Sequence, residues 1–195
     1  MHEFFCGIIY GMGLLDKDIR EPLFWYFEEK YGMVRFIEEK TIGRSRADVM
    51  LVTPDSLIGI EIKSDADSYV RLKSQVKSYD KYFDYNYVVV GASHKKHVEE
   101  HVPAHWGIVS CHEGEDDMVF ELVRIAEPNK KVKIEHKISI LWRRELNNIC
   151  EECLKYRYTH LSKAQLGKKI IEAVDKDRLD RLISRELFNR DYTTI

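Results

Sequence analysis

The chain has 195 residues, of which 44% are apolar, 33% are charged and 11% are aromatic. This length suits one domain, or one domain with a small appendage, and the apolar share is sufficient for a sizeable core. The apolar segment 4–15 is shorter than the ~18 residues of a transmembrane helix and follows Glu3 rather than a basic region. We therefore expect no membrane span and no signal peptide, and we treat the first dozen residues as a packed or frayed extension.

Charge is divided unevenly along the chain, although the net charge is only −2. Residues 1–120 hold 14 Lys and Arg against 21 Asp and Glu, whereas residues 121–195 hold 17 against 12. The acidic first part suits a cation site and the basic second part suits a polyanion, but solvated lysine-rich helices would give the same balance. Four irregularly spaced cysteines favour a reduced, cytoplasmic protein over a disulfide framework.

The first two thirds of the chain are predicted to contain strands interrupted by helices. Apolar residues at spacings of three and four predict helices at 18–32 and 67–84, and a short helical segment at 94–102 that ends before Pro103. A Pro54-Asp55 pair predicts a turn between two strands. Runs of apolar and β-branched residues predict strands at 33–39, 48–52, 57–63, 85–91, 106–111 and 118–126.

From about residue 138 onward the periodicity is helical, with segments expected at 138–156, 163–174 and 176–190. This order of elements predicts an α/β fold, in which a mixed central sheet is flanked by helices and followed by a C-terminal α-helical region. We place the boundary between the α/β domain, residues 1–130, and the basic helical region, residues 131–195, after the last predicted strand.

The strand at 57–63 has an unusual composition, because Glu61 and Lys63 interrupt an apolar run. Strand alternation places both on one face and the isoleucines on the other, core-facing side, so the charged pair is expected to point outward. If the turn is centred between residues 54 and 55, paired residues have numbers that sum to 109, and Asp48 lies opposite Glu61. Opposed side chains in an antiparallel pair lie about 5 Å apart at Cβ, although a bulge would shift the register.

Two carboxylates at that distance repel each other unless a cation lies between them. A hard divalent ion such as Mg²⁺ prefers oxygen ligands, which Asp48 and Glu61 provide. Lys63, on the same face, would then reach a bound water or a phosphate oxygen. The alternative is a structural ion pair of Lys63 at a strand edge.

These residues and their spacing resemble the PD-(D/E)XK nuclease superfamily. Asp48, twelve intervening residues and Glu61-Ile62-Lys63 resemble its D…(D/E)xK motif, and Gln75-x-x-x-Tyr79 resembles the QxxxY motif of the RecB-like branch. The order of strand, hairpin, crossover helix and buried strand is also similar. Residues 20–110 resemble a bacterial and phage branch of this superfamily, with one departure: Ala47 stands where the family usually has proline before the first aspartate.

The resemblance implies a restriction-endonuclease-like core and a Mg²⁺-dependent nuclease, with Mn²⁺ as an alternative ion. It implies that Asp48, Glu61 and the backbone carbonyl of Ile62 hold the metal. Lys63 would orient or activate the attacking water and offset charge on the phosphate. Gln75 would orient the site or contact DNA. Tyr79 also belongs to the apolar face of its helix, so core packing and site support are equally open.

The family often has an additional acidic ligand upstream. Glu39 and Glu21 are both candidates, and we favour Glu39 because it precedes the hairpin closely in the chain. Three arginines border the predicted site: Arg44, Arg46 and Arg71. They are candidates for binding phosphates, and the alternative is that they are solvated surface charges.

Two other constellations compete for a metal. Four histidines recur at spacings of three and four: His94, His97, His101 and His105. Pro103 interrupts the segment that carries them, and no acid or cysteine completes a zinc site there. Cys150 and Cys153, with Cys6 far upstream, resemble the iron–sulfur cysteines of some RecB-like nucleases. No further cysteine follows the pair closely, so helical packing is the better interpretation.

The sequence therefore predicts an endonuclease that hydrolyses phosphodiester bonds of nucleic acid, with DNA as the expected substrate, in repair, restriction or phage–host conflict. A basic C-terminal region would grip the backbone, and a homodimer would suit double-strand cleavage. The alternative is a non-enzymatic module on a nuclease fold that binds nucleic acid or inhibits a protein. No Gly-rich phosphate loop and no Gly-x-Ser-x-Gly motif is present, so nucleotide hydrolysis and serine hydrolysis are not indicated.

Overall fold

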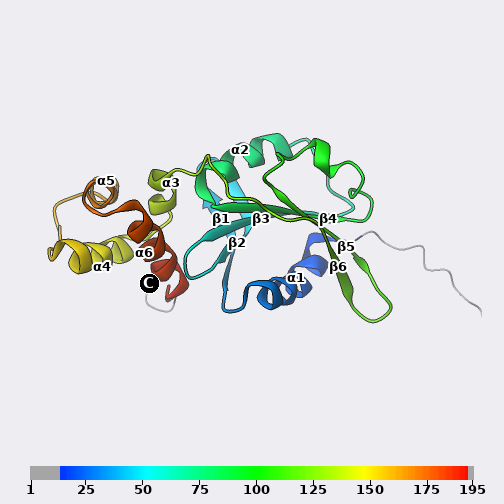
Figure 1. The fold of residues 1–195 in the computed structure, drawn as a ribbon, viewed down its shortest axis with the longest axis horizontal. Coiled ribbons are helices and arrows are strands. Elements are labelled where there is room, and N and C mark those ends of the chain that lie inside the picture. Colours follow the sequence, from blue (N-terminus) through cyan, green and yellow to red (C-terminus); the bar gives the residue numbers. More distant parts are fainter. Residues whose placement is uncertain (1–13, 193–195) are drawn as a thin grey trace, which may run out of the picture.

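The computed structural model describes residues 14–192, which form a mixed six-stranded sheet with helices on both faces (Figure 1). The strands lie in chain order across the sheet. The second strand is antiparallel to the first and the third, the third to fifth are parallel, and the sixth is antiparallel to the fifth. The strands are β1 (Arg35–Ile42), β2 (Ser45–Val52), β3 (Leu57–Lys63), β4 (Tyr85–Gly91), β5 (Gly107–Glu113) and β6 (Met118–Arg124).

Helix α1 (Asp16–Tyr31) covers one face of the sheet and α2 (Leu72–Tyr82) covers the other (Figure 1). The C-terminal helices gather beside one end of the sheet, and a short 3₁₀ helix, η1 (Val98–Glu100), precedes β5. This arrangement confirms the predicted fold class. The C-terminal helices are α3 (Ile134–Ser139), α4 (Arg143–Leu154), α5 (Lys163–Ala173) and α6 (Lys176–Phe188).

Two of the predicted strands, 57–63 and 85–91, have the bounds observed for β3 and β4. The short helical segment predicted at 94–102 is present only as the 3₁₀ helix η1, and the rest of the segment consists of turns and a bend. The predicted helix at 138–156 is two helices. A hairpin between β1 and β2 was not predicted; it closes at Gly43, whose φ of 63° suits glycine.

Strand β3 is buried along its whole length because helices cover both of its faces. Its isoleucines pack in one cluster with apolar residues of α1. On the opposite face, Gly59 lies under α2, where an added Cβ would overlap the ring of Phe83 and lie 2.7 Å from Tyr79 Cδ1. Glycine at this position therefore lets α2 approach the sheet closely.

Ion pairs connect the C-terminal helices to the sheet and to each other. Lys137 of α3 is 1% exposed and bonds Asp84, between α2 and β4, at 2.8 Å and Asp180 of α6 at 2.6 Å. Arg190 bonds Glu145 of α4 at 2.6 Å. The cluster of apolar residues beneath α2 continues into these helices. The predicted boundary at residue 130 lies between β6 and α3.

None of the described helices is long and apolar enough to cross a membrane. The predictions made for the first dozen residues, including Cys6, lie outside the described part of the chain.

Candidate active site

The β2–β3 hairpin has the predicted register. Val49 pairs with Ile60 and Val52 with Leu57, so paired residue numbers sum to 109. The regular pairing ends at Val49, one pair before Asp48 would meet its predicted neighbour. The hairpin thus brings Asp48 to the end of β3, as the sequence predicts, but by a different contact.

That contact is a hydrogen bond in which the Ile62 backbone N–H donates to Asp48 Oδ2 at 2.9 Å. The neighbouring strand β1 is also irregular at this point, because regular pairing is interrupted at Glu39, whose φ is 51°. A left-handed φ is uncommon outside glycine. Carboxylates from β1, β2 and β3 therefore meet at one end of the sheet, where the strand pairing is locally broken.

Glu61 and Lys63 lie on the face of β3 that α2 covers. Glu61 is fully buried and Lys63 is 4% exposed, so the prediction that they point outward is wrong. The apolar stripe of α2 packs on this face and encloses both charges. Lys63 Nζ lies 2.7 Å from Glu61 Oε1 and donates to Gln75 Oε1 at 3.3 Å. The ammonium is therefore held in place from two sides.

Gln75 and Tyr79 project from α2 onto this pair. Gln75 Nε2 donates to Glu61 Oε1, and the Tyr79 hydroxyl donates to Glu61 Oε2 at 2.7 Å. The same hydroxyl accepts a hydrogen bond from the Asp48 backbone N–H at 3.1 Å. Tyr79 is also fully buried, with its ring 5.4 Å from that of Trp106. It serves both roles left open by the sequence: it packs in the core and it fixes the two carboxylate-bearing strands.

The electrostatics of the site disfavour negative charge. Burial, and then the charge of Glu61, raise the pKa of Asp48 from 3.8 to about 7, while the bond from Ile62 and the charge of Lys63 act in the opposite direction. Burial and the same two carboxylates raise the pKa of Tyr79, which stays protonated as a donor. A bound cation would relieve the cost of ionising Asp48 beside Glu61.

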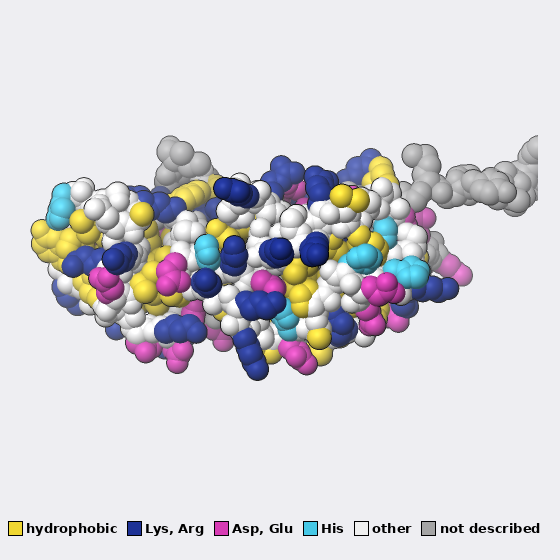
Figure 2. Space-filling model, turned by 90° about the horizontal axis from the view of Figure 1, so that it is seen from above, with side chains coloured by type: hydrophobic (Ala, Val, Ile, Leu, Met, Phe, Trp, Pro, Cys, Tyr) yellow, Lys and Arg dark blue, Asp and Glu magenta, His cyan; other side chains and the backbone are white. Residues whose placement is uncertain are grey.

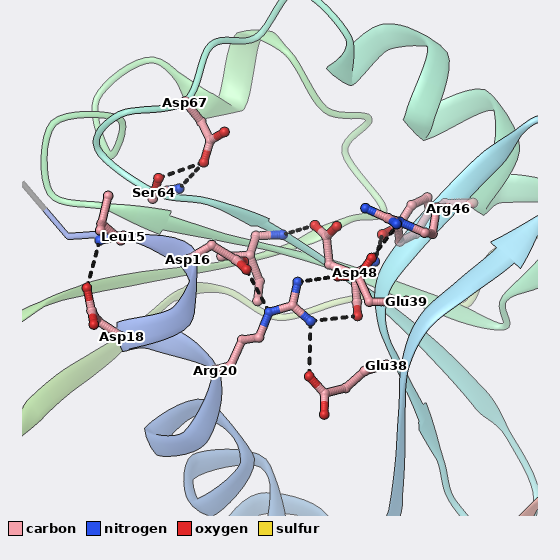
Figure 3. A network of polar contacts seen from close by, with 12 residues as sticks. Leu15, Asp16, Asp18, Arg20, Glu38, Glu39, Arg46, Asp48, Ser64 and Asp67 are labelled. Atoms are coloured by element: carbon pink, nitrogen blue, oxygen red, sulfur yellow. Dashed lines mark hydrogen bonds and ion pairs between the residues drawn. The ribbon is translucent and has the colours of Figure 1, made fainter.

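Arg20 of α1 is the main feature that the sequence analysis missed. Its guanidinium bonds Asp16 at 2.7 Å, Glu38 at 3.1 Å and Glu39 at 2.5 Å, and donates to the Asp48 carbonyl at 3.3 Å (Figure 3). The spacing of Asp16 and Arg20 is a recognisable helical pair, but the contacts to β1 and β2 arise only when α1 packs on the sheet. Arg20 joins α1 to the strands that carry the site.

One cavity of about 580 Å³ is lined by Asp16 and Arg20 of α1 and by predicted site residues of β2, β3 and α2. Glu39 is at its wall, where it also bonds Arg46 at 2.5 Å, whereas Glu21 lines a separate cavity beside Trp25. The structure thus brings together all the predicted site residues apart from Tyr79, which supports the cavity from behind, and leaves Glu21 elsewhere. The cavity is lined by Asp16, Arg20, Glu39, Thr41, Gly43, Arg44, Ser45, Arg46, Asp48, Glu61, Ile62, Lys63, Asp67, Arg71, Ser74 and Gln75.

The competing metal constellations gain no support. Within residues 14–192, no group of three His, Cys, Asp or Glu side chains is placed to hold a metal ion. The histidines of segment 94–105 are among the side chains that this statement covers. The described cysteines, Cys111, Cys150 and Cys153, are free thiols. The same finding covers the carboxylates of the cavity, so a metal ion there stays a prediction.

Comparisons with known proteins place the chain in a family. No curated protein matches it. The solved structure of Pyrococcus furiosus SfsA in complex with Ca²⁺ is similar over 57% of this chain and 61% of its own, at 15% identity and a TM-score of 0.35, so the chain spans about three fifths of that protein's length. Residues 28–194 match the family described as bacteriophage P4 protein cII, and this chain belongs to that family.

Proposed function

We propose that this protein is a Mg²⁺-dependent nuclease of the PD-(D/E)XK type. The observation that carries the proposal is the meeting of Asp48, Glu61, Lys63 and Gln75 in one cavity, with the two carboxylates and the ammonium on neighbouring strand ends. A charged group that is buried without a functional reason is uncommon. The β2–β3 hairpin and α2 position all four side chains, as the resemblance to this superfamily implies.

The donor set fits Mg²⁺. Asp48 and Glu61 offer carboxylate oxygens and Ile62 a backbone carbonyl, which are the hard ligands that this ion takes together with water. The raised pKa of Asp48 indicates a site that favours an added positive charge. When bound, Mg²⁺ would supply Lewis acidity toward a phosphate oxygen and lower the pKa of a coordinated water.

The protein's own groups would perform the remaining tasks. Lys63, held by Glu61 and Gln75, is placed to stabilise negative charge that develops on a scissile phosphate. Arg44 and Arg71 lie at the cavity wall and would bind flanking phosphates. Arg46 would join them only if its 2.5 Å pair with Glu39 opened.

DNA is the proposed substrate, and binding would be largely independent of sequence and sensitive to salt, because phosphate contacts dominate. The family's name refers to a bacteriophage P4 protein, which fits the phage–host setting among those the sequence allows. The competing function is a binding or inhibitor module that retains the nuclease fold without cleaving.

The test is metal-dependent cleavage. Supercoiled plasmid, linear duplex, single-stranded DNA and RNA are incubated with the protein in Mg²⁺, Mn²⁺ or EDTA. Asp48→Asn and Lys63→Met are compared with the exposed control variants Asp116→Asn and Lys96→Met. We expect cleavage only with metal, a loss of at least ~100-fold in both site variants, and wild-type rates in both controls.

Near-UV circular dichroism identifies any variant that fails to fold. If Lys63→Met does not fold, Asp48→Asn still provides the test, because its side-chain oxygen can accept the hydrogen bond from the Ile62 N–H. Binding of nucleic acid without cleavage by the wild type under any condition would favour the non-enzymatic module. Cleavage that persists in both folded site variants would show that the chemistry occurs elsewhere.

A further inference from the structure

The exposed face of α2 carries cations and small polar side chains, with no exposed acid. Lys73, Lys77 and Lys81 recur every four residues and are all exposed. Residues four apart lie on one side of a helix, about 6 Å apart along its axis. Among the described residues, none of the three has a carboxylate partner. The lysines therefore form an unneutralised row.

The helix contains one acid, Asp80, and the fold turns it inward. Its side chain is 6% exposed; it accepts from Trp106 Nε1 at 2.9 Å and lies 3.0 Å from His105 Nε2 and 2.9 Å from Lys131 Nζ. These contacts compensate the charge of Asp80, which therefore does not neutralise the lysines on the outer face. Elsewhere the surface does pair its cations, as Lys95 with Glu121 at 2.5 Å and Arg185 with Glu152 at 2.5 Å.

The row runs along α2 from the end of the helix that borders the candidate active site. At its first end, Arg71 immediately precedes α2 and lines the cavity beside Gln75. At its other end, the Lys133 backbone N–H donates to the Lys81 carbonyl at 3.0 Å, which brings a further exposed lysine to the helix terminus. Figure 2, which looks down on the α2 side, shows Lys and Arg side chains gathered across the middle of this face.

The field at the far end of the row is positive. Burial, and then the charges of Lys81 and Lys133, lower the pKa of His136. The rings of His136 and Tyr82 are in contact in a tilted arrangement, with centroids 4.9 Å apart. By contrast, the cavity beside α1 on the opposite face is lined by four carboxylates, those of Glu21, Glu28, Glu29 and Asp117. That cavity and the lysine row on α2 therefore differ in charge, and an anionic polymer would be drawn to the row.

We infer that Arg71, Lys73, Lys77, Lys81 and Lys133, here called the α2 track, bind the phosphodiester backbone of the nucleic acid strand that enters the cavity. This inference rests on the proposed function, since it names where the substrate continues beyond the scissile bond. Helix α2 has 11 residues and is therefore about 16 Å long, which corresponds to about five nucleotides at 3.4 Å each. The track leads toward α3, so the C-terminal region would meet the strand only beyond this point.

The test measures binding separately from cleavage. Fluorescence anisotropy follows a labelled single strand of about 20 nucleotides and its duplex in EDTA, across a series of salt concentrations. The triple variant Lys73→Gln, Lys77→Gln and Lys81→Gln keeps good helix formers and removes three positive charges. Its matched control removes three surface lysines outside both the track and the basic C-terminal region, with the same change in net charge: Lys17→Gln, Lys95→Gln and Lys96→Gln.

We expect the track variant to lower the magnitude of the slope of log K against log salt by about 2 to 3, and the control to leave it within about 1 of wild type. Equal slopes for the track variant and the control would overturn the inference, because binding would then depend on net charge alone. If the triple variant unfolds, Lys77→Gln by itself is compared with Lys96→Gln by itself; we expect a change of about 1 in the first and no change in the second. The binding assay is carried out in EDTA, which prevents metal-dependent cleavage. Its outcome is therefore independent of whether the protein cleaves nucleic acid in the assay described under Proposed function.

Discussion

Asp48→Asn is predicted to stabilise the metal-free protein at alkaline pH. Burial and the neighbouring Glu61 make the ionised Asp48 carboxylate costly in the folded state. Asparagine has nearly the same shape, and its Oδ1 can still accept the hydrogen bond that Ile62 N–H donates at 2.9 Å. The substitution therefore removes the charge while it retains the contact.

The magnitude follows from the pKa of Asp48, which is 3.8 for the ordinary group and about 7 in the folded protein. Below 3.8 both states are protonated and the group has no effect. Between these values the unfolded chain ionises first, so the folded wild type loses stability as pH rises; above 7 the loss is complete. At ~1.4 kcal/mol per pKa unit, the cost reaches about 4 kcal/mol at pH 8 and about 1.6 kcal/mol at pH 5.

Urea unfolding of the two proteins in EDTA, at pH 5 and at pH 8, measures this difference. The stability of Asp48→Asn relative to wild type should increase by about 2 to 3 kcal/mol between the two pH values. Mg²⁺ should then stabilise the wild type and not the variant, because a ligand that binds the folded state alone raises its stability. A difference that is the same at both pH values would refute the reasoning that Asp48 is ionised at a cost.

Two further predictions concern packing and the additional acid. Gly59→Ala should destabilise the fold by about 1–3 kcal/mol in urea unfolding, because the new Cβ would displace Phe83 and Tyr79; an unchanged midpoint would show that α2 adapts freely. Glu39→Gln should slow cleavage by about 10-fold and Glu21→Gln by less than about twofold, because Glu39 lines the cavity and Glu21 does not. A larger loss of initial rate in Glu21→Gln than in Glu39→Gln would exclude Glu39 as the additional acidic ligand.

The local features of the fold were predictable because they depend on neighbours in the chain. The Pro54-Asp55 turn sets the β2–β3 register, and the continuous apolar run of β4 marks a strand buried on both faces. The segment 94–102 has helical spacing in its histidines, but it forms turns in which the 3₁₀ helix buries only Val98. A periodic polar pattern without an apolar face gives a helix little to pack.

The residues of the candidate site could be selected from the sequence, but their surroundings could not. The motif residues Asp48, Glu61 and Lys63 can be recognised in the sequence because they are charged residues in an otherwise apolar hairpin. Their burial could not be read from alternation, because it depends on how closely α2 sits on β3. Arg20 was missed for a similar reason: its contacts with β1 and β2 depend on the packing of α1, which no local pattern specifies.

The position of a bound metal tests the central claim most directly. Crystals grown with Mn²⁺, which can take the place of Mg²⁺ at oxygen sites and scatters anomalously, would locate the ion. We predict an anomalous peak in the cavity, coordinated by Asp48, Glu61 and the Ile62 carbonyl, and no peak there in Asp48→Asn. An empty cavity in wild-type crystals, with Mn²⁺ bound at another site or at none, would contradict the account.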